Sequence, residues 1–423
     1  MIKIIKEDNI DDFIKLTSEP TFNPKNNIWP TFQTSIFVEC ISLMQLMALF
    51  GSMKCFKQAT LTCDYDIFDV QKYAIAGGNS EIIHILENQG VSFDSCFEVS
   101  IKFHRHEICD WLQNHYYCEE VKLSKALIYH NIKFFFFRVN SIDCSIHENN
   151  EGLICASQYN YINFVKYLCE TCQADVETKG KNGYTPINRA ARFDHIDIVK
   201  YLYEVCHAYI ETRDKWERTP INNASFNGRL DVVKYLYETC HSSIVSKDKE
   251  GCTPISNASS NLHFDVIQYL YETCHANIET KDNYGKTPIN YASERGFLDA
   301  VKYLYETCHA YIETRDNHGC TPISNALERG YLDIIKYLHE TCHADVESKD
   351  NDGRTPINIA SENGYLEVVK YLYETCHANV ETKDNNESTL INWASRNVIT
   401  SVIGFKSAIY SWRAFRIIVA FLY

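Results

Sequence analysis

The sequence has no apolar run long enough to cross a bilayer. Its two most apolar stretches, residues 36–50 and 408–423, contain polar or charged side chains and fall short of the roughly 20 residues that a membrane-spanning helix needs. Residues 1–6 are mixed in character and lead into acidic residues, so they do not resemble a secretory signal. We therefore expect a chain with no membrane span that is located in the cytoplasm, and we leave a nuclear location open.

Positive charge is scarce relative to negative charge. The 423 residues include 41 lysines and arginines against 55 aspartates and glutamates, which gives a formal net charge of −14. Proteins that hold nucleic acid through its phosphates need the opposite balance. A local basic patch is compatible with this composition, but nucleic acid is not an expected partner.

The sequence also lacks the short motifs of common enzyme families. It contains no phosphate-binding loop of the form G-x-x-x-x-G-K-[ST], no H-E-x-x-H zinc motif, no G-x-S-x-G nucleophile motif and no kinase signature. We expect no enzymatic activity and no cofactor.

What the sequence does contain is a strict internal repeat. The motif Thr-Pro-Ile-(Asn/Ser)-x-Ala recurs every 34 residues, beginning at Thr185, Thr219, Thr253, Thr287, Thr321 and Thr355. A period of this length is typical of a solenoid, in which small units stack and share an extended core. Solenoids present long surfaces instead of enclosed pockets, so the repeat favours binding over catalysis.

Residues 282–315 illustrate one unit of the repeat. Thr287 and Pro288 suit the N-cap and the first position of a helix that ends near Gly296. A second helix is expected over residues 298–306, because apolar residues there share one helical stripe. The stripe consists of Leu298, Val301, Leu304 and Cys308. The Asp-x-x-Gly sequence before each first helix predicts a protruding turn.

The order Asp-x-x-Gly-x-Thr-Pro-Ile-x-x-Ala, Gly and Val-x-Tyr-Leu resembles the ankyrin repeat, whose signature is Thr-Pro-Leu-His-x-Ala. The resemblance implies an all-α ankyrin-repeat solenoid of helix–turn–helix units with protruding turns or short hairpins. Two features depart from the family. The connection after the second helix is one residue longer, and Asn or Ser occupies the histidine position of the signature. Asn or Ser would then have to supply the family's hydrogen bond from this position to the neighbouring loop.

The repeats are expected to cover residues 147–400, and residues 401–423 then form a divergent cap or a tail. Fainter helical copies of the unit precede them, over residues 2–16, 47–61, 73–87, 100–112 and 126–139. This order resembles the degenerate ankyrin-like N-terminal domain of many protist ankyrin proteins, which we assign to residues 1–146.

Seven of the eighteen cysteines recur at the repeat period: Cys172, Cys206, Cys240, Cys274, Cys308, Cys342 and Cys376. Equivalent residues of stacked helices lie roughly 8–10 Å apart. Disulfide partners need Cα atoms within about 7 Å, so neighbours in this ladder are expected to stay reduced. A histidine follows six of these cysteines. Because zinc needs about four converging ligands, we interpret each pair as a buried thiol and a polar ring at a helix end.

His104, His106 and Cys109 form a separate H-x-H-x-x-C pattern. Structural zinc sites normally show a second cluster of ligands, and none matches this one in spacing. We expect no metal site there. An enzyme or metal-binding module within residues 1–146 is nevertheless the alternative function of a different class.

Positions that differ between otherwise near-identical repeats are the candidates for binding a partner. Repeated apolar positions are determined by packing, whereas varied positions on turns and first helices are available for contacts or for neutral drift. Tyr, Trp and Arg are enriched at interface hot spots. In ankyrin proteins the turns and first helices form the concave binding face, and the resemblance therefore implies this set of candidates: Tyr184, Arg192, Trp216, Phe226, Tyr284, Tyr291, Arg295, His318, Arg329 and Arg354.

Trp216 is the strongest of these candidates. In its turn Glu217 stands where other repeats have glycine, so the turn either avoids a positive φ there or is strained. We expect Trp216, beside Lys215 and Arg218, to be exposed and to anchor a partner.

These features predict a non-enzymatic scaffold or adaptor that binds an unidentified protein partner through its concave face and acts as a monomer. A structural spacer without a specific partner is the second alternative.

Overall fold

The computed structural model describes residues 2–18, 41–62, 69–116, 118, 121–140 and 145–389, and within these residues it contains helices and no strand. The predicted all-α fold is confirmed. Contacts within the chain divide it into two units, residues 1–159 and residues 160–423. The boundary proposed from the sequence at residue 146 stays a prediction. The boundary at residue 400 and the segment 401–423 lie outside the described residues.

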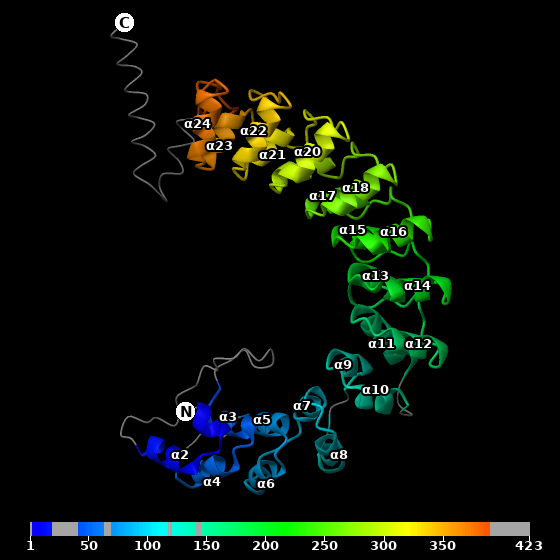
Figure 1. Cartoon of the computed structure of the whole chain (residues 1–423), viewed down its shortest axis with the longest axis vertical. Helices are drawn as coiled ribbons and strands as arrows, with labels where there is room; N and C mark the ends of the chain where they lie inside the picture. The colour runs from blue at the N-terminus through cyan, green and yellow to red at the C-terminus, as the bar shows by residue number, and fades with distance from the viewer. Residues whose placement is uncertain are drawn as a thin grey trace. The chain divides into compact units, whose positions relative to one another are not determined.

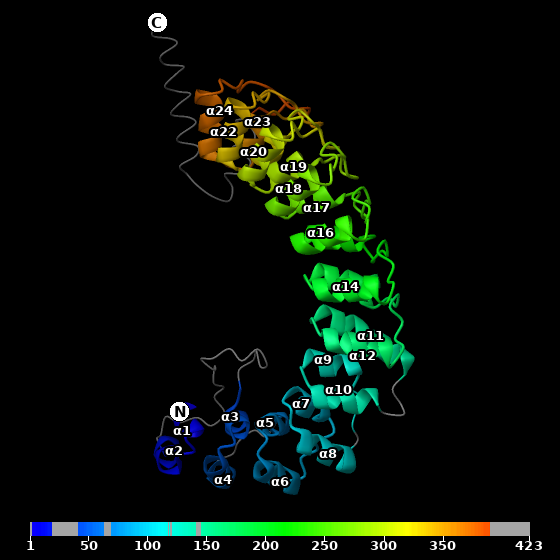
Figure 2. The ribbon, with the colours of Figure 1, turned by 45° about the vertical axis from the view of Figure 1, so that its right-hand side comes forward.

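The first unit consists of short helices that follow one another in pairs (Figures 1 and 2). From α1 to α6, first members of successive pairs touch, as in α3 and α5, and second members do the same, as in α4 and α6. Each faint copy expected from the sequence lies on one of these pairs. The helices are α1 (Ile2–Lys6), α2 (Ile10–Thr17), α3 (Leu43–Phe50), α4 (Met53–Thr62), α5 (Val70–Gly77), α6 (Ser80–Asn88), α7 (Phe97–Lys102), α8 (His106–His115), α9 (Leu123–Ile128), α10 (Ile132–Val139) and α11 (Ile146–Gln158).

The second unit is a regular stack of helix pairs in two rows. Odd-numbered helices from α13 onward form one row and even-numbered helices the other (Figure 1). We call them first helices and second helices. They are α12 (Ile162–Glu170), α13 (Pro186–Arg192), α14 (Ile196–Glu204), α15 (Pro220–Phe226), α16 (Leu230–Glu238), α17 (Pro254–Ser260), α18 (Phe264–Glu272), α19 (Pro288–Glu294), α20 (Leu298–Glu306), α21 (Pro322–Leu327), α22 (Leu332–Glu340), α23 (Pro356–Glu362) and α24 (Leu366–Glu374). A single 3-10 turn, Lys181–Gly183, precedes α13.

The helix pair α19 and α20 confirms the bounds predicted for residues 282–315. Thr287 is the extended N-cap, and its side chain and that of Asn290 form a reciprocal capping box. Gly296 then adopts φ +80°, a left-handed conformation that glycine reaches without strain. Along α20, the side chains of Val301 and Leu304 are fully buried against the first-helix row and the neighbouring repeats.

Each repeat is hydrogen-bonded to the next by side chains that recur at the same position. A tyrosine hydroxyl of one second helix donates to a glutamate of the preceding repeat, at 2.7–2.9 Å, for example from Tyr269 to Glu238. A basic side chain likewise donates to the backbone carbonyl 34 residues further on, as from Lys247 to Lys281. These bonds hold successive repeats in one register.

The signature position occupied by Asn supplies the expected loop hydrogen bond in three repeats. Asn188, Asn222 and Asn358 donate through Nδ2 to backbone carbonyls at 3.0–3.3 Å, 24 residues further along the chain. At these positions, asparagine supplies the hydrogen bond expected of the signature histidine, and the prediction is confirmed.

Candidate protein-binding surface

The turns before the first helices form one continuous row, which with the outward sides of the first helices we call the turn surface. Within each turn an aspartate organises the backbone: the Oδ1 atom of Asp282 accepts from the amides of Tyr284 and Lys286 at 2.9 and 2.8 Å. Between turns, the amide of Asn283 donates to the carbonyl of Glu250 at 2.9 Å. The turn surface is therefore built on a hydrogen-bonded frame.

One varied position on the first helices serves this frame instead of facing solvent. Asn223, Asn257 and Asn325 occupy it in three repeats, and each donates to the aspartate of its own turn at 3.1–3.3 Å. Tyr291 occupies it in another repeat and donates through its hydroxyl to Asp282. In these four repeats the residue type thus varies while the contact with the turn aspartate stays the same.

Tyr184 and Tyr291 were both expected to be exposed, and both expectations are wrong. The Tyr184 side chain is 1% exposed, because Trp216 of the next repeat and the guanidinium of Arg189 cover its ring. The Tyr291 side chain is 8% exposed, because its hydroxyl reaches Asp282 and the Sγ atom of Cys252 lies 3.7 Å away. Burial raises the pKa of Tyr291. Both tyrosines are packing residues beneath the turn surface.

The other eight candidates reach the surface to different extents. Arg192, Phe226 and Arg354 are half-buried. The exposed candidates are Trp216, Tyr284, Arg295, His318 and Arg329.

One group on the turn surface, here called the basic–aromatic patch, consists of Arg189, Arg192, Lys215, Trp216, Arg218 and Phe226, and the buried ring of Tyr184 lies beneath them. The Trp216 and Tyr184 rings lie 5.7 Å apart between centroids, and Trp216 remains 36% exposed. Arg192 donates to the Tyr184 hydroxyl. The Arg218 guanidinium stacks 3.8 Å from the centroid of Phe226. The aromatic rings thus hold these cations in defined positions.

Sequence reasoning missed the role of Arg189, although a signal was present. In its repeat Gly180 replaces the turn aspartate. Arg189 occupies the first-helix position that in other repeats donates to the turn aspartate, and here that aspartate is absent. Its guanidinium carbon lies 4.1 Å from the centroid of the Tyr184 ring.

From the sequence, the turn at Glu217 either avoids a positive φ or is strained, and the structure decides between these alternatives. Glu217 adopts φ +57°, so this residue has the left-handed conformation of the other turns although it is not a glycine. In the repeats with Gly251, Gly285, Gly319 and Gly353, a Cβ atom would lie 2.5 Å from an asparagine Oδ1 atom of the next turn. Opposite Glu217 the next turn has Lys249, whose sequence position corresponds to those asparagines.

We expect Glu217→Gly to raise the free energy of unfolding by about 0.5–1 kcal/mol. A left-handed conformation costs a non-glycine residue about 1–2 kcal/mol, which exceeds the entropic cost of adding a glycine. Urea denaturation measures the change. The matched control is Glu250→Gly, in the next turn at a position without positive φ, which should destabilise. Equal effects of both substitutions would contradict strain at Glu217.

The charges of the turn surface change along the second unit. Toward its C-terminal end, Lys286 pairs with Glu294 and Arg354 with Glu362, each at 2.7 Å. These pairs neutralise each other. In the basic–aromatic patch, Arg218 likewise pairs with Asp248 at 3.3 Å, whereas Arg189 and Arg192 lie over the Tyr184 ring. The cations of the patch outnumber this carboxylate, so the patch keeps net positive charge.

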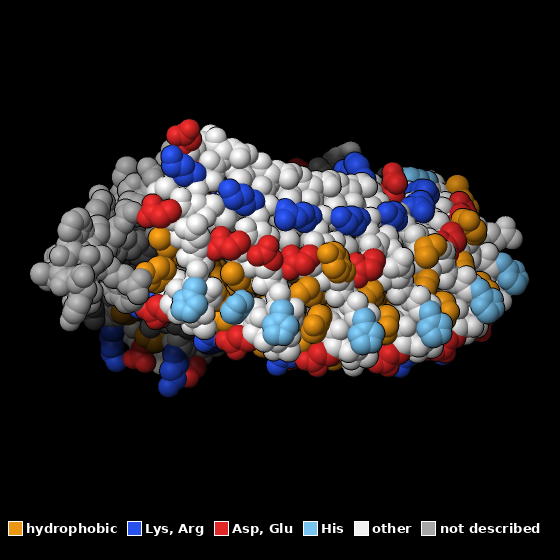
Figure 3. Space-filling model, turned by 90° about the horizontal axis from the view of Figure 1, so that it is seen from above, with side chains coloured by type: hydrophobic (Ala, Val, Ile, Leu, Met, Phe, Trp, Pro, Cys, Tyr) orange, Lys and Arg blue, Asp and Glu red, His pale blue; other side chains and the backbone are white. Residues whose placement is uncertain are grey.

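The end of each second helix, where it meets the next connection, carries the repeated cysteines and histidines. Cys240, Cys274, Cys308 and Cys342 are buried, as expected for the end of an apolar stripe. Burial raises the pKa of Cys274 to about 11, which makes this thiol a poor nucleophile at neutral pH. The histidines that follow are exposed, and Figure 3 shows a row of them beside rows of acidic and basic side chains. Each of them adopts a φ of +54° to +57°.

The His104, His106 and Cys109 side chains do not converge. His104 Nε2 lies 2.9 Å from the Tyr129 carbonyl, whereas the Cys109 thiol lies 2.9 Å from the hydroxyl of Ser100. Within the described residues, no three His, Cys, Asp or Glu side chains are grouped as metal ligands would be.

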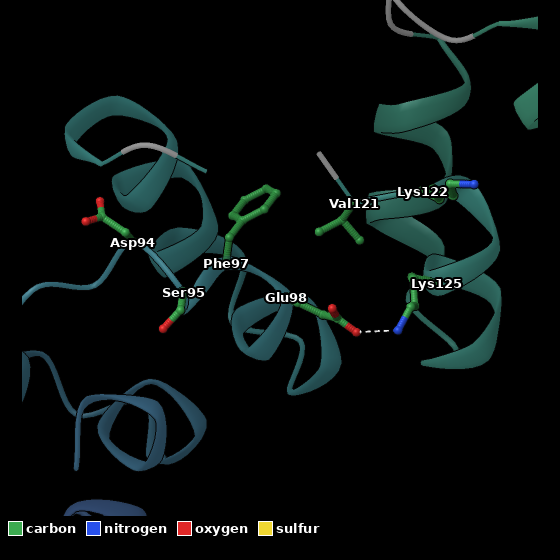
Figure 4. A pocket seen from close by; sticks show the side chains of 7 residues that line it. All are labelled: Asp94, Ser95, Phe97, Glu98, Val121, Lys122 and Lys125. Atoms are coloured by element: carbon green, nitrogen blue, oxygen red, sulfur yellow. Dashed lines mark hydrogen bonds and ion pairs between the residues drawn. The ribbon is translucent and has the colours of Figure 1, made fainter. Parts of the chain in front are cut away.

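A cavity of about 160 Å³ lies between α7 and α9 in the first unit (Figure 4). Glu98 accepts from Lys125 at its rim at 2.6 Å. Burial alone would raise the pKa of Glu98, but the hydrogen bonds from Lys125 and Tyr129 lower it. The carboxylate and the amine thus neutralise each other, and the alternative of an enzyme in residues 1–146 gains no support from this cavity.

Stacked helix pairs with a row of protruding turns define a repeat protein of the interaction-module type. A family model for ankyrin repeats (3 copies) matches overlapping segments: 122–214, 152–248, 205–282, 221–316, 273–350, 306–384 and 326–403. The chain belongs to the ankyrin-repeat family. Ankyrin repeats are generally protein–protein interaction modules, and proteins built from them are typically non-enzymatic.

Residues 67–138 match the model of a domain of unknown function, DUF3447. No curated protein matches the chain. Among the described helices, none is both long and apolar enough to span a bilayer.

Proposed function

We propose that this chain is a non-enzymatic scaffold that binds a partner protein through the turn surface, and that the basic–aromatic patch receives an acidic segment of that partner. We further propose that it acts as a monomer in the cytoplasm.

The observation that carries the proposal is the gathering of cations and aromatic rings within two successive repeats. Arg189, Arg192, Lys215 and Arg218 lie there in a chain whose formal net charge is −14. Trp216 adds an exposed apolar surface beside them. Arg and Trp supply most of the energy at many interfaces, and a local positive patch speeds the approach of an acidic partner.

The test reverses charge on the patch and, as a matched control, on the second helices of the same two repeats. Affinity capture with the full chain, followed by quantitative mass spectrometry, compares wild type with Arg192→Glu/Lys215→Glu and with Lys200→Glu/Lys234→Glu. We expect the patch variant to lose specific partners by about tenfold, because two interface charges contribute on the order of 1.4 kcal/mol. The control should retain them. Loss of the same partners in both variants, or in neither, would contradict the proposed site.

A further inference from the structure

One position of the second helices carries a residue that packs against the following repeat. Tyr203, Tyr237, Tyr271 and Tyr305 occupy it in four repeats, and each ring meets a tyrosine of the next second helix with centroids 6.4–6.5 Å apart. Two repeats depart from this pattern. Cys169 occupies the position in α12, and His339 occupies it in α22.

The same position also faces the repeated cysteine of the following repeat. In the α22 repeat, the Nδ1 atom of His339 lies 3.4 Å from the Sγ atom of Cys376, a residue 37 positions later. The corresponding residue for Cys169 is Cys206, also 37 positions later (206 − 169 = 37). By the same offset Cys169 faces Cys206, and α12 and α14 pack side by side. Between α12 and α14 two thiols therefore face each other, whereas in the other repeats an aromatic or imidazole ring faces the repeated cysteine.

We propose that Cys169 and Cys206 form an oxidant-sensitive disulfide that links two successive repeats. A peroxide is the class of oxidant that we invoke. The Cys206 sulfur first attacks one peroxide oxygen, the O–O bond breaks, and the other oxygen leaves as water, which gives a sulfenic acid at Cys206. The Cys169 thiol then attacks that sulfur, forming the S–S bond and releasing the second water. The two cysteines lose two electrons and two protons, and the peroxide is reduced.

The surroundings of the pair fit this order of events. Both residues are half-buried, so a small oxidant has access to them. Burial, followed by the neighbouring Cys206, raises the pKa of Cys169. A raised pKa makes Cys169 a weak nucleophile toward peroxide, which suits the resolving role.

Other pairings are disfavoured by geometry. Cys172 and Cys206 are equivalent residues of neighbouring repeats, at the helix-packing distance that exceeds the span of a disulfide. Cys169 and Cys172 are close in sequence, but Cys169 lies within α12 and Cys172 beyond its end. A bond between them would require the last turn of α12 to unwind.

The test uses the full reduced chain, treated with hydrogen peroxide under native conditions, blocked with N-ethylmaleimide and digested without reduction. We expect mass spectrometry to find a peptide that joins Cys169 to Cys206, with loss of two reactive thiols. Thermal unfolding should shift to a higher midpoint after oxidation and return after addition of a reductant, because the bond constrains the unfolded chain.

Two variants keep the result interpretable if a substitution perturbs folding. Cys169→Tyr introduces the residue of the other repeats and should abolish both the linked peptide and the thermal shift. Cys172→Ala removes the neighbouring thiol and should leave both unchanged. A dominant link through Cys172, or oxidation of Cys169 and Cys206 without a bond between them, would overturn the proposal.

Discussion

Replacement of Leu304 by alanine is expected to lower the free energy of unfolding by about 2–5 kcal/mol. The Leu304 side chain is fully buried in α20, between the neighbouring second helices α18 and α22. The hydrogen bonds between repeats hold both neighbours in place, so the structure can close only part of the cavity left by the lost methyl groups. Urea denaturation of the full chain measures the change.

Leu298→Ala in the same helix is the matched control. Leu298 is half-buried at the start of α20, so its truncation removes less buried surface and should cost less. Hydrogen exchange should also become faster in α18, α20 and α22 of the Leu304 variant, because repeats are stabilised by their nearest neighbours. A cost near zero for Leu304→Ala would mean that the apolar stripe had been assigned to the wrong face.

The helix pairs could be predicted from sequence because local rules and packing agree within each repeat. Thr287 and Pro288 start α19 where a cap and an N1 proline belong, and the apolar stripe of α20 predicts its bounds, Leu298–Glu306. The same signals recur six times, so an error in one copy would have been visible against the others. Consistency of this kind is what specifies a single fold.

The binding surface was less predictable, because variation between repeats was interpreted as exposure. Tyr291 varies and is nevertheless buried, since its position donates to the turn aspartate in several repeats. Tyr184 is buried because Trp216, a residue 32 positions later, covers it. Residues that touch in neighbouring repeats are separated in sequence by an offset that depends on how the units stack. The 34-residue period alone does not give that offset.

The offset also explains why the Cys169 and Cys206 pair was not predicted. Only cysteines at equivalent positions were compared, and those lie a full repeat apart. The contact between His339 and Cys376 shows that, at this position of the second helices, the facing residue lies 37 positions later. Because residue 169 is a cysteine where most other repeats have a tyrosine, two thiols lie together at this position.

Trp216→Ala is expected to weaken partner binding by about 2 kcal/mol, a typical hot-spot loss, because Trp216 is the exposed ring of the basic–aromatic patch. Because the Trp216 ring covers Tyr184, we also expect a cost of about 0.5–1.5 kcal/mol in unfolding free energy. Binding is measured by titration calorimetry with a partner identified by affinity capture, and stability by urea denaturation.

Two controls separate these contributions. Trp216→Phe keeps an aromatic ring against Tyr184 and should retain most of the stability while losing part of the affinity. Tyr209→Ala removes a more exposed aromatic side chain, 62% against 36% for Trp216, from the connection after α14, which belongs to neither the turns nor the first helices, and should leave binding unchanged. If Trp216→Ala lowers stability but leaves affinity at the wild-type value, Trp216 serves only to cover Tyr184. The partner then binds elsewhere, because an anchor residue cannot be removed without loss of affinity.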